Sequence, residues 1–162
     1  MIKKFSLLLL LTFPALGWGQ NNENSVDVLF DKDEMLQRVN EARSESRRCG
    51  GEKHEATHPL VWNEKLARAA QAHANDMAEH EFFDHTGSDS STIVMRVERQ
   101  DYVWGAVGEN VAMGPRTVAE VVEGWLKSPG HCSNIMNSDF REIGAAISEK
   151  GYYWVQVFGA PR

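Results

Sequence analysis

The chain has 162 residues, with 17 lysine and arginine residues against 23 aspartate and glutamate residues and a formal net charge of −6 at pH 7. This length suits a single domain with a substantial core. The acidic balance and the lack of a basic run argue against nucleic-acid binding and against electrostatic docking on anionic membranes.

Residues 1–19 have the pattern of a secretory signal peptide. Lys3 and Lys4 precede an apolar run over 5–16, and Gly17 and Gly19 supply the small residues that a signal peptidase needs. The run is shorter than the roughly 20 residues of a bilayer-spanning helix, so we expect no transmembrane segment. Cleavage is expected after Gly19, with Gly17 as the alternative. It would leave an exported chain, secreted or periplasmic, with 15 basic and 23 acidic residues and a charge of −8.

Residues 20–32 are polar and are expected to form an N-terminal tail, so that the folded domain covers 33–162. A first helix is predicted over 33–47, because one stripe of it is apolar at helical spacing. That stripe consists of Met35, Val39 and Ala42.

Cys49 and Cys132 are the only cysteines of the chain. In an exported protein an even number favours a disulfide. A bridge between them would close a loop that the chain-entropy model credits with roughly 4 kcal/mol of stabilisation. The alternative is a pair of free thiols, one of them beside His131. A bridge would fix the backbone of that histidine.

The middle of the chain predicts a second helix over 64–80, with Asn63 as its N-cap. A third helix is predicted after Thr117, which forms a capping box with Glu120. Its apolar face follows helical spacing. That face consists of Val118, Val121, Val122 and Trp125.

Pro129 interrupts the third helix, and Ser128 is expected to cap a short new helix that begins at Pro129 and runs to Met136. His131 would then lie in the first turn of this short helix.

Strands are predicted over 109–113, 142–148 and 152–158, with a hairpin turn at 149–151. The last strand is apolar on both faces, which indicates a central strand covered by helices on both sides. The pattern predicts an α+β fold: a three-layer α-β-α sandwich with a small, mainly antiparallel sheet between helical layers.

Two histidines and one glutamate lie in short motifs where no obvious structural role requires these residue types. His85 precedes Thr86-Gly87, His131 follows Pro129-Gly130, and Glu109 lies between Gly108 and Asn110. Imidazole is the commonest protein metal ligand, and its charge changes near neutral pH. These side chains therefore indicate a metal or acid/base site if the fold brings them together.

In these segments the chain resembles a bacterial member of the CAP superfamily (SCP domain), the group of cysteine-rich secretory proteins, antigen 5 and plant pathogenesis-related proteins. The contexts of Cys49 and Cys132 also resemble the bridged cysteines of bacterial members. The resemblance covers about 35–158 and is carried by many short motifs in order. These motifs are 59–63, 66–70, 73–74, 83–87, 108–110, 125–131, 134–136, 143–145 and 153–156.

The resemblance implies the α-β-α sandwich and a cleft with two histidines and two acidic residues, which in some members binds zinc or another divalent cation. His85, His131 and Glu109 match three of these positions. The second acidic position holds Ser128, which would be a polar neighbour in the cleft. Glu123 is not taken as its substitute, because it precedes Trp125 by two residues and would point elsewhere on the helix.

Two imidazoles leave at least two positions of a zinc ion open, so a metal held by His85 and His131 would be exchangeable and partly hydrated. Glu109 could be a third ligand, or it could fix one imidazole in a single tautomer through a hydrogen bond. The plainer alternative is that the histidines only join loops. His73 is interpreted as a packing residue, and Arg96 as a structural partner for an acid such as Asp84 or Glu142.

The favoured hypothesis is an exported domain that binds a divalent cation, with zinc as the candidate, together with a small ligand such as a lipid or a partner in the cell envelope. The alternative is a metal-dependent hydrolase or peptidase that uses Glu109 with His85 and His131. No nucleophile or substrate-positioning group is evident, which disfavours an enzyme. A second alternative is a purely structural envelope domain.

Overall fold

The computed structural model describes residues 30–162, so the predicted signal peptide over 1–19 and most of the predicted tail over 20–32 lie outside the described residues. Within this range no helix is long and apolar enough to cross a membrane. The helices and strands are α1 (Lys32–Arg43), β1 (Arg47–Cys49), β2 (Glu52–His54), β3 (Val61–Trp62), α2 (Glu64–Glu79), α3 (Ile93–Glu98), β4 (Trp104–Met113), α4 (Val118–Lys127), α5 (Pro129–Met136), β5 (Glu142–Ile147) and β6 (Tyr153–Pro161).

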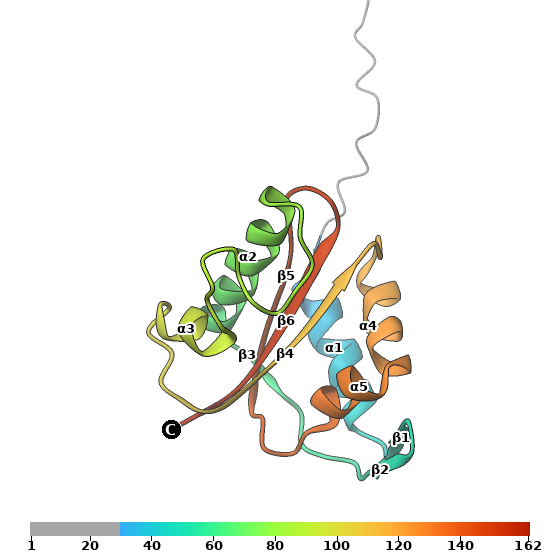
Figure 1. The fold of residues 1–162 in the computed structure, drawn as a ribbon. Helices are drawn as coiled ribbons and strands as arrows, with labels where there is room; N and C mark the ends of the chain where they lie inside the picture. The colour runs from blue at the N-terminus through green and yellow to red at the C-terminus, as the bar shows by residue number, and fades with distance from the viewer. Residues whose placement is uncertain (1–29) are drawn as a thin grey trace, which may run out of the picture.

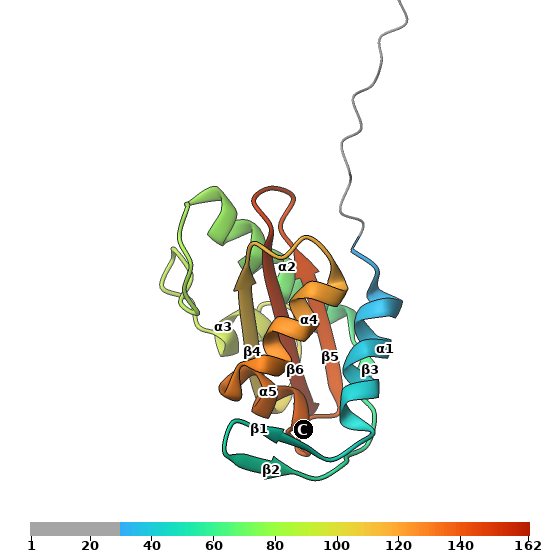
Figure 2. The same ribbon diagram turned by 90° about the vertical axis from the view of Figure 1, so that its right-hand side faces the viewer.

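A four-stranded sheet lies between two layers of helices (Figure 1). The strand order is β3-β5-β6-β4, and β6 pairs antiparallel with both β5 and β4, whereas β3 pairs parallel with β5. Helices α1, α4 and α5 cover one face, and α2 and α3 cover the other (Figure 2). The predicted α-β-α sandwich with a mainly antiparallel sheet is confirmed.

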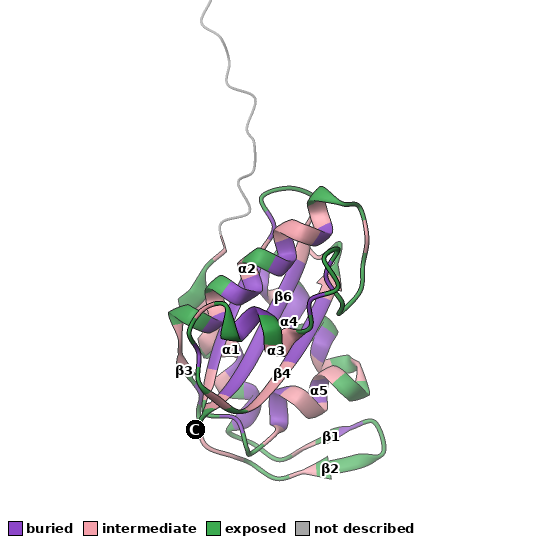
Figure 3. Cartoon of the chain, turned by 60° about the vertical axis from the view of Figure 1, so that its left-hand side comes forward, coloured by how far each residue is buried: buried purple, intermediate pink, exposed green. Residues whose placement is uncertain are grey.

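Strand β6 is the centre of the core, as its apolar faces predicted. Trp154 and Phe158 pack toward α1, α4 and α5, and Val155 and Val157 pack toward α2 and α3. All four side chains are fully buried, and the neighbouring strands β5 and β6 are largely buried (Figure 3). Full burial of a valine or phenylalanine stabilises the fold by about 1.5–3 kcal/mol.

The predicted helix caps form as hydrogen bonds. Oδ1 of Asn63 accepts from the N–H of Lys65 at 2.9 Å. Oγ1 of Thr117 accepts from the N–H of Glu120 at 3.1 Å. In a capping box the carboxylate of Glu120 would accept from the N–H of the N-cap residue, Thr117. Here it accepts instead from the N–H of the preceding residue, Arg116, at 2.7 Å. Each cap satisfies backbone donors that the first helical turn leaves free.

Helix α1 begins one residue before the predicted start and brings part of the predicted tail into the fold. It starts at Lys32 because the carboxylate of Asp31 accepts from backbone N–H groups of the first turn. Phe30 packs near the rings of Trp62 and Trp154, with centroids 6.0 and 6.2 Å away. The ordered domain thus includes residues 30–32.

The same helix ends at Arg43, four residues before the predicted end. The hydroxyl of Ser44 donates to the carbonyl of Glu41 and closes the last turn. The buried guanidinium of Arg43 donates to the carbonyls of Ile135 at 2.6 Å and Asn137 at 2.9 Å, so the end of α1 is joined to the end of α5.

Four elements were not predicted: β1, β2, β3 and α3. They contain between two and six residues, which is too short for a periodic pattern. Strand β4 also starts at Trp104, five residues earlier than predicted, because Gly105 and Gly108 mask its pattern. A side chain at Gly108 would collide with Phe140, so glycine is required by packing there.

The predicted disulfide between Cys49 and Cys132 is present and joins β1 to α5. Both cysteines are buried in the core. Because Cys132 follows His131, the bridge fixes the short helix that carries this histidine.

Gly144 marks a close approach of β5 to α2. A Cβ atom at this position would lie 2.1 Å from the backbone nitrogen of Ala67 and 2.4 Å from the carbonyl carbon of Leu66. The absent side chain lets the helix lie directly on the sheet.

Candidate functional site

The two predicted histidines come from opposite helical layers, and both contact the edge strand β4. His85 lies in the connection between α2 and α3, and His131 lies in the first turn of α5. The helices α2 and α5 cover opposite faces of the sheet (Figure 1). Glu109 belongs to β4, the outermost strand on that side.

Glu109 is a buried carboxylate with both oxygens bonded. Its Oε1 accepts from Nδ1 of His85 at 2.8 Å, and its Oε2 accepts from Nη2 of Arg96 at 2.8 Å. Only 3% of its side chain is exposed, against 59% for His85. This geometry matches the second of the two predicted roles of Glu109, the orientation of an imidazole, and leaves Nε2 of His85 free.

Arg96 is the residue whose importance the sequence did not reveal. The interpretation that it pairs with Asp84 or Glu142 was wrong. The carboxylate of Asp84 instead accepts from the N–H of Thr86, and that of Glu142 accepts from the hydroxyl of Tyr102. Local spacing could not select the correct acid, because the partner lies on another element.

His73 lies beside this cluster and is fully buried. Its Nε2 donates to the carbonyl of Asp84 at 2.9 Å, and its Nδ1 has no partner within residues 30–162. Desolvation is the main cause that lowers the pKa of His73, so its ring is neutral near pH 7. The 4.0 Å between its Nε2 and Oε1 of Glu109 is therefore not an ion pair. This agrees with the predicted packing role.

Asn110 holds the second histidine through its backbone. The fully buried Asn110 amide donates to the carbonyl of His131 at 3.2 Å and accepts from the amide of Asn134 at 2.9 Å. Successive strand residues point to opposite faces of a sheet. Adjacent residues of β4 thus hold the two histidines from opposite sides, Glu109 through the ring of His85 and Asn110 through the backbone of His131.

Ser128 is the N-cap residue of α5, as predicted, but its hydroxyl makes no capping hydrogen bond. Its place as a polar neighbour in the cleft stays a prediction. Glu123 is exposed and pairs with Lys127 at 2.6 Å, one turn along α4. It therefore does not take the position of the second acidic residue.

The two candidate histidines have pKa values shifted in opposite directions. The hydrogen bond to Glu109 is the main cause that raises the pKa of His85 above 6.5. Burial, followed by the charge of His85, lowers the pKa of His131 below 6.5.

We expect an NMR titration of the metal-free protein to give a pKa above 6.5 for His85 and below 6.5 for His131. Glu109→Gln removes the carboxylate charge, so the pKa of His85 should fall toward its ordinary value. Because folding raises the pKa of His85, its stabilising contribution is present below pH 6.5 and is lost as the pH rises through the folded-state pKa. An unchanged pKa of His85 in Glu109→Gln would contradict the assigned contact.

The donor set limits what metal the site could hold. Across residues 30–162, no group of three or more histidine, cysteine, aspartate or glutamate side chains is arranged to hold a metal ion. With Glu109 bonded to His85 and Arg96, the available ligands are the two imidazoles. A cation held by these two nitrogens would need water or another ligand to complete its coordination, so this donor set does not make a closed structural site.

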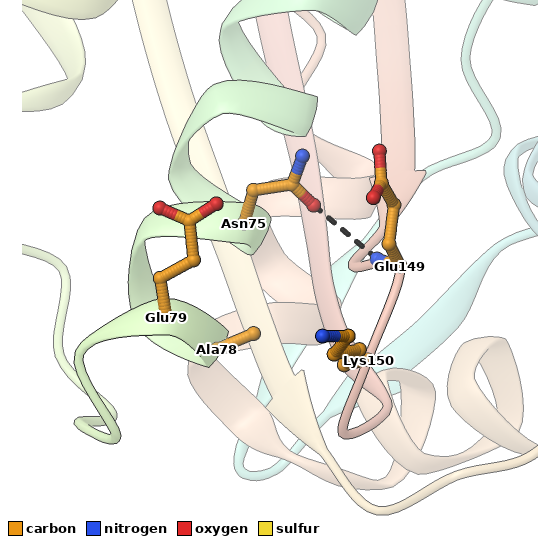
Figure 4. Close-up of a pocket in the computed structure, with 5 residues that line it drawn as sticks. All are labelled: Asn75, Ala78, Glu79, Glu149 and Lys150. Carbon is orange, nitrogen blue, oxygen red and sulfur yellow. Dashed lines mark hydrogen bonds between the residues drawn. The ribbon is translucent and has the colours of Figure 1, made fainter.

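A separate cavity of about 340 Å³ lies where the end of α2 meets the β5–β6 turn (Figure 4). It is lined by Asn75, Ala78, Glu79, Glu149 and Lys150, and Oδ1 of Asn75 accepts from the N–H of Glu149. None of the predicted site residues lines it.

Comparisons with known proteins show a consistent likeness. The cysteine-rich secretory protein family, CAP, matches residues 36–158. The uncharacterized protein YkwD of Bacillus subtilis is 35% identical over 100 residues, which cover 62% of this chain and 39% of that protein. The solved structure of an extracellular protein containing an SCP domain from Bacillus anthracis is 27% identical, with a TM-score of 0.61 over 64% of this chain and 34% of that chain.

A third likeness, the crystal structure of NaASP2 with Zn²⁺, is 14% identical, with a TM-score of 0.58 over 80% of this chain and 79% of that chain, and shows the fold alone. The chain spans about two fifths of the length of YkwD and one third of the Bacillus anthracis protein.

Proposed function

Since the chain belongs to the cysteine-rich secretory protein (CAP) family, we propose that it is an exported binding domain of the bacterial type, secreted or periplasmic, whose His85 and His131 hold an exchangeable divalent cation. Zinc is the candidate cation, because imidazole nitrogens are among its preferred ligands. The solved Bacillus anthracis relative is described as extracellular, which supports export.

The hydrogen bond between His85 and Glu109 carries this proposal. A carboxylate that accepts from one ring nitrogen fixes the tautomer and increases the basicity of the other nitrogen. The contact at 2.8 Å thus leaves Nε2 of His85 as a prepared ligand. His131 supplies the second imidazole, and none of its ring atoms forms a hydrogen bond within the described chain.

The bound cation would supply a positive charge and open coordination positions at the protein surface. Water, a small ligand such as a lipid headgroup, or an oxygen donor of an envelope component could occupy these positions. Ser128 at the start of α5 is the polar side chain that we propose beside them. The solved structure of NaASP2 with Zn²⁺ supports the compatibility of this fold with zinc.

The geometry favours binding over hydrolysis. A hydrolase would need Glu109 to take a proton from water, but both of its oxygens already accept hydrogen bonds from His85 and Arg96.

Isothermal titration with zinc tests the function on untagged protein from which metal has been removed. We expect the wild type to bind one zinc ion with a dissociation constant on the order of 1 µM. Loss of a partner that only orients a ligand costs about 10–100-fold in metal affinity. We therefore expect His85→Ala and His131→Ala each to weaken binding by at least about 100-fold.

His80→Ala is the matched control, since His80 is exposed at the end of α2 and its ring pairs with Asp76. It should bind zinc as the wild type does. The proposal is wrong if the wild type binds no zinc, or if all three variants bind it equally well.

A further inference from the structure

Arg96 holds His85 in two ways with one nitrogen atom. Its Nη2 donates to Oε2 of Glu109 at 2.8 Å and to the backbone carbonyl of His85 at 3.0 Å. Glu109 in turn accepts from the ring of His85. The guanidinium therefore fixes the backbone of this histidine directly and its ring through one carboxylate.

The other terminal nitrogen of Arg96 fixes the far end of the same loop. Nη1 donates to the carbonyl of Ser91 at 2.8 Å, and this carbonyl also accepts from the N–H of Gly87 at 2.9 Å. Arg96 thus ties both ends of the segment 85–91, which carries the exposed imidazole on an otherwise irregular stretch of chain.

The burial of Arg96 carries a free-energy cost, so a packing role alone does not explain why an arginine occupies this position. Its side chain is 4% exposed, and its Nε has no hydrogen-bond partner in the described part of the chain. An unpartnered buried donor destabilises the fold, and an apolar side chain of similar size would avoid this cost. The planar fork of arginine reaches several acceptors at once, and a lysine ammonium cannot reproduce this geometry.

We propose that Arg96 is a positioning residue that sets the orientation of His85 at the cation site. The inference rests on the proposed function for its role in cation binding, and on the contacts above for its role in orientation. Arg96 does not touch the cation itself.

Arg96→Lys tests the proposal, because it keeps the charge and most of the buried volume while it removes the fork. Long-range ¹H–¹⁵N spectra of chelator-treated protein report which ring nitrogen of His85 carries the proton. In the wild type the proton should lie on Nδ1, and in Arg96→Lys we expect a mixture of tautomers. Zinc affinity should fall about tenfold.

Arg99→Lys is the matched control, since Arg99 lies at the end of the same helix in an exposed pair with Asp89. It should keep the Nδ1 tautomer and the wild-type affinity. If Arg96→Lys only lowers the melting temperature while the tautomer and the zinc affinity are unchanged, the proposal is overturned. If the wild type binds no zinc, the proposed function fails, but the tautomer comparison still decides whether Arg96 orients His85.

Discussion

Replacement of Gly144 by alanine is expected to destabilise the folded domain by about 3 kcal/mol or more, the upper end of the range for an overpacked core. The new methyl group would lie 2.1 Å from the backbone nitrogen of Ala67. The obstructing atoms belong to the helical backbone, so no side chain can rotate away. Helix α2 would have to move off β5, which would open the contact between Leu66 and the sheet.

Urea denaturation followed by circular dichroism measures this effect, and Gly124→Ala provides a control of opposite sign. Gly124 lies inside α4, and a Cβ atom there meets no atom within 4 Å. Alanine is favoured over glycine in a helix by about 1 kcal/mol, so this variant should be more stable than the wild type. A Gly144→Ala variant within 1 kcal/mol of the wild type would mean that α2 can shift at little cost.

Arg96→Met is expected to cost about 3–5 kcal/mol of stability, because it leaves the carboxylate of Glu109 buried without its cation. The 2.8 Å contact between Arg96 and Glu109 is almost fully shielded from solvent, with side-chain exposures of 4% and 3%. A typical domain is stable by only about 5–15 kcal/mol, so the variant should approach the threshold of unfolding.

Two further variants separate the buried charge from other effects. Arg99→Met breaks an exposed pair with Asp89 at 2.8 Å and should change stability by less than about 1 kcal/mol. The double variant Arg96→Met/Glu109→Gln should be more stable than Arg96→Met, because it also removes the unpaired charge. If the destabilisation of the double variant equals the sum of the destabilisations of Arg96→Met and Glu109→Gln, the effect of Arg96→Met does not arise from the unpaired buried carboxylate.

The fold could be predicted from the sequence where a cap and a periodic pattern coincide. Asn63 and Thr117 mark the starts of α2 and α4, and the alternation in β6 shows a strand buried on both faces. The hairpin of β1 and β2 could not be predicted, since three residues in each strand carry no period. Its position depends on the disulfide and on α5, which are distant in the sequence.

The site could be predicted only in part. His85, Glu109 and His131 were named from their motifs, but the role of Glu109 depends on which group neutralises it. Arg96 is 13 residues away from Glu109 on another element, and no local pattern selects this acid. The sequence could therefore not distinguish between the two predicted roles of Glu109, metal ligand and hydrogen-bond partner of an imidazole. The three-dimensional contacts of its carboxylate distinguish them.

Side chains of α4 and α5 bind backbone carbonyls of the edge strand β4. On β4 the carbonyl of Glu109 accepts from the amide of Asn134 at 3.1 Å, and the carbonyl of Val111 accepts from the indole of Trp125 at 3.2 Å. At the other edge β3 is only two residues long. An unpaired edge is a template for aggregation between copies. We therefore expect α5, the helix that carries His131, also to hinder the pairing of β4 with a strand of another copy.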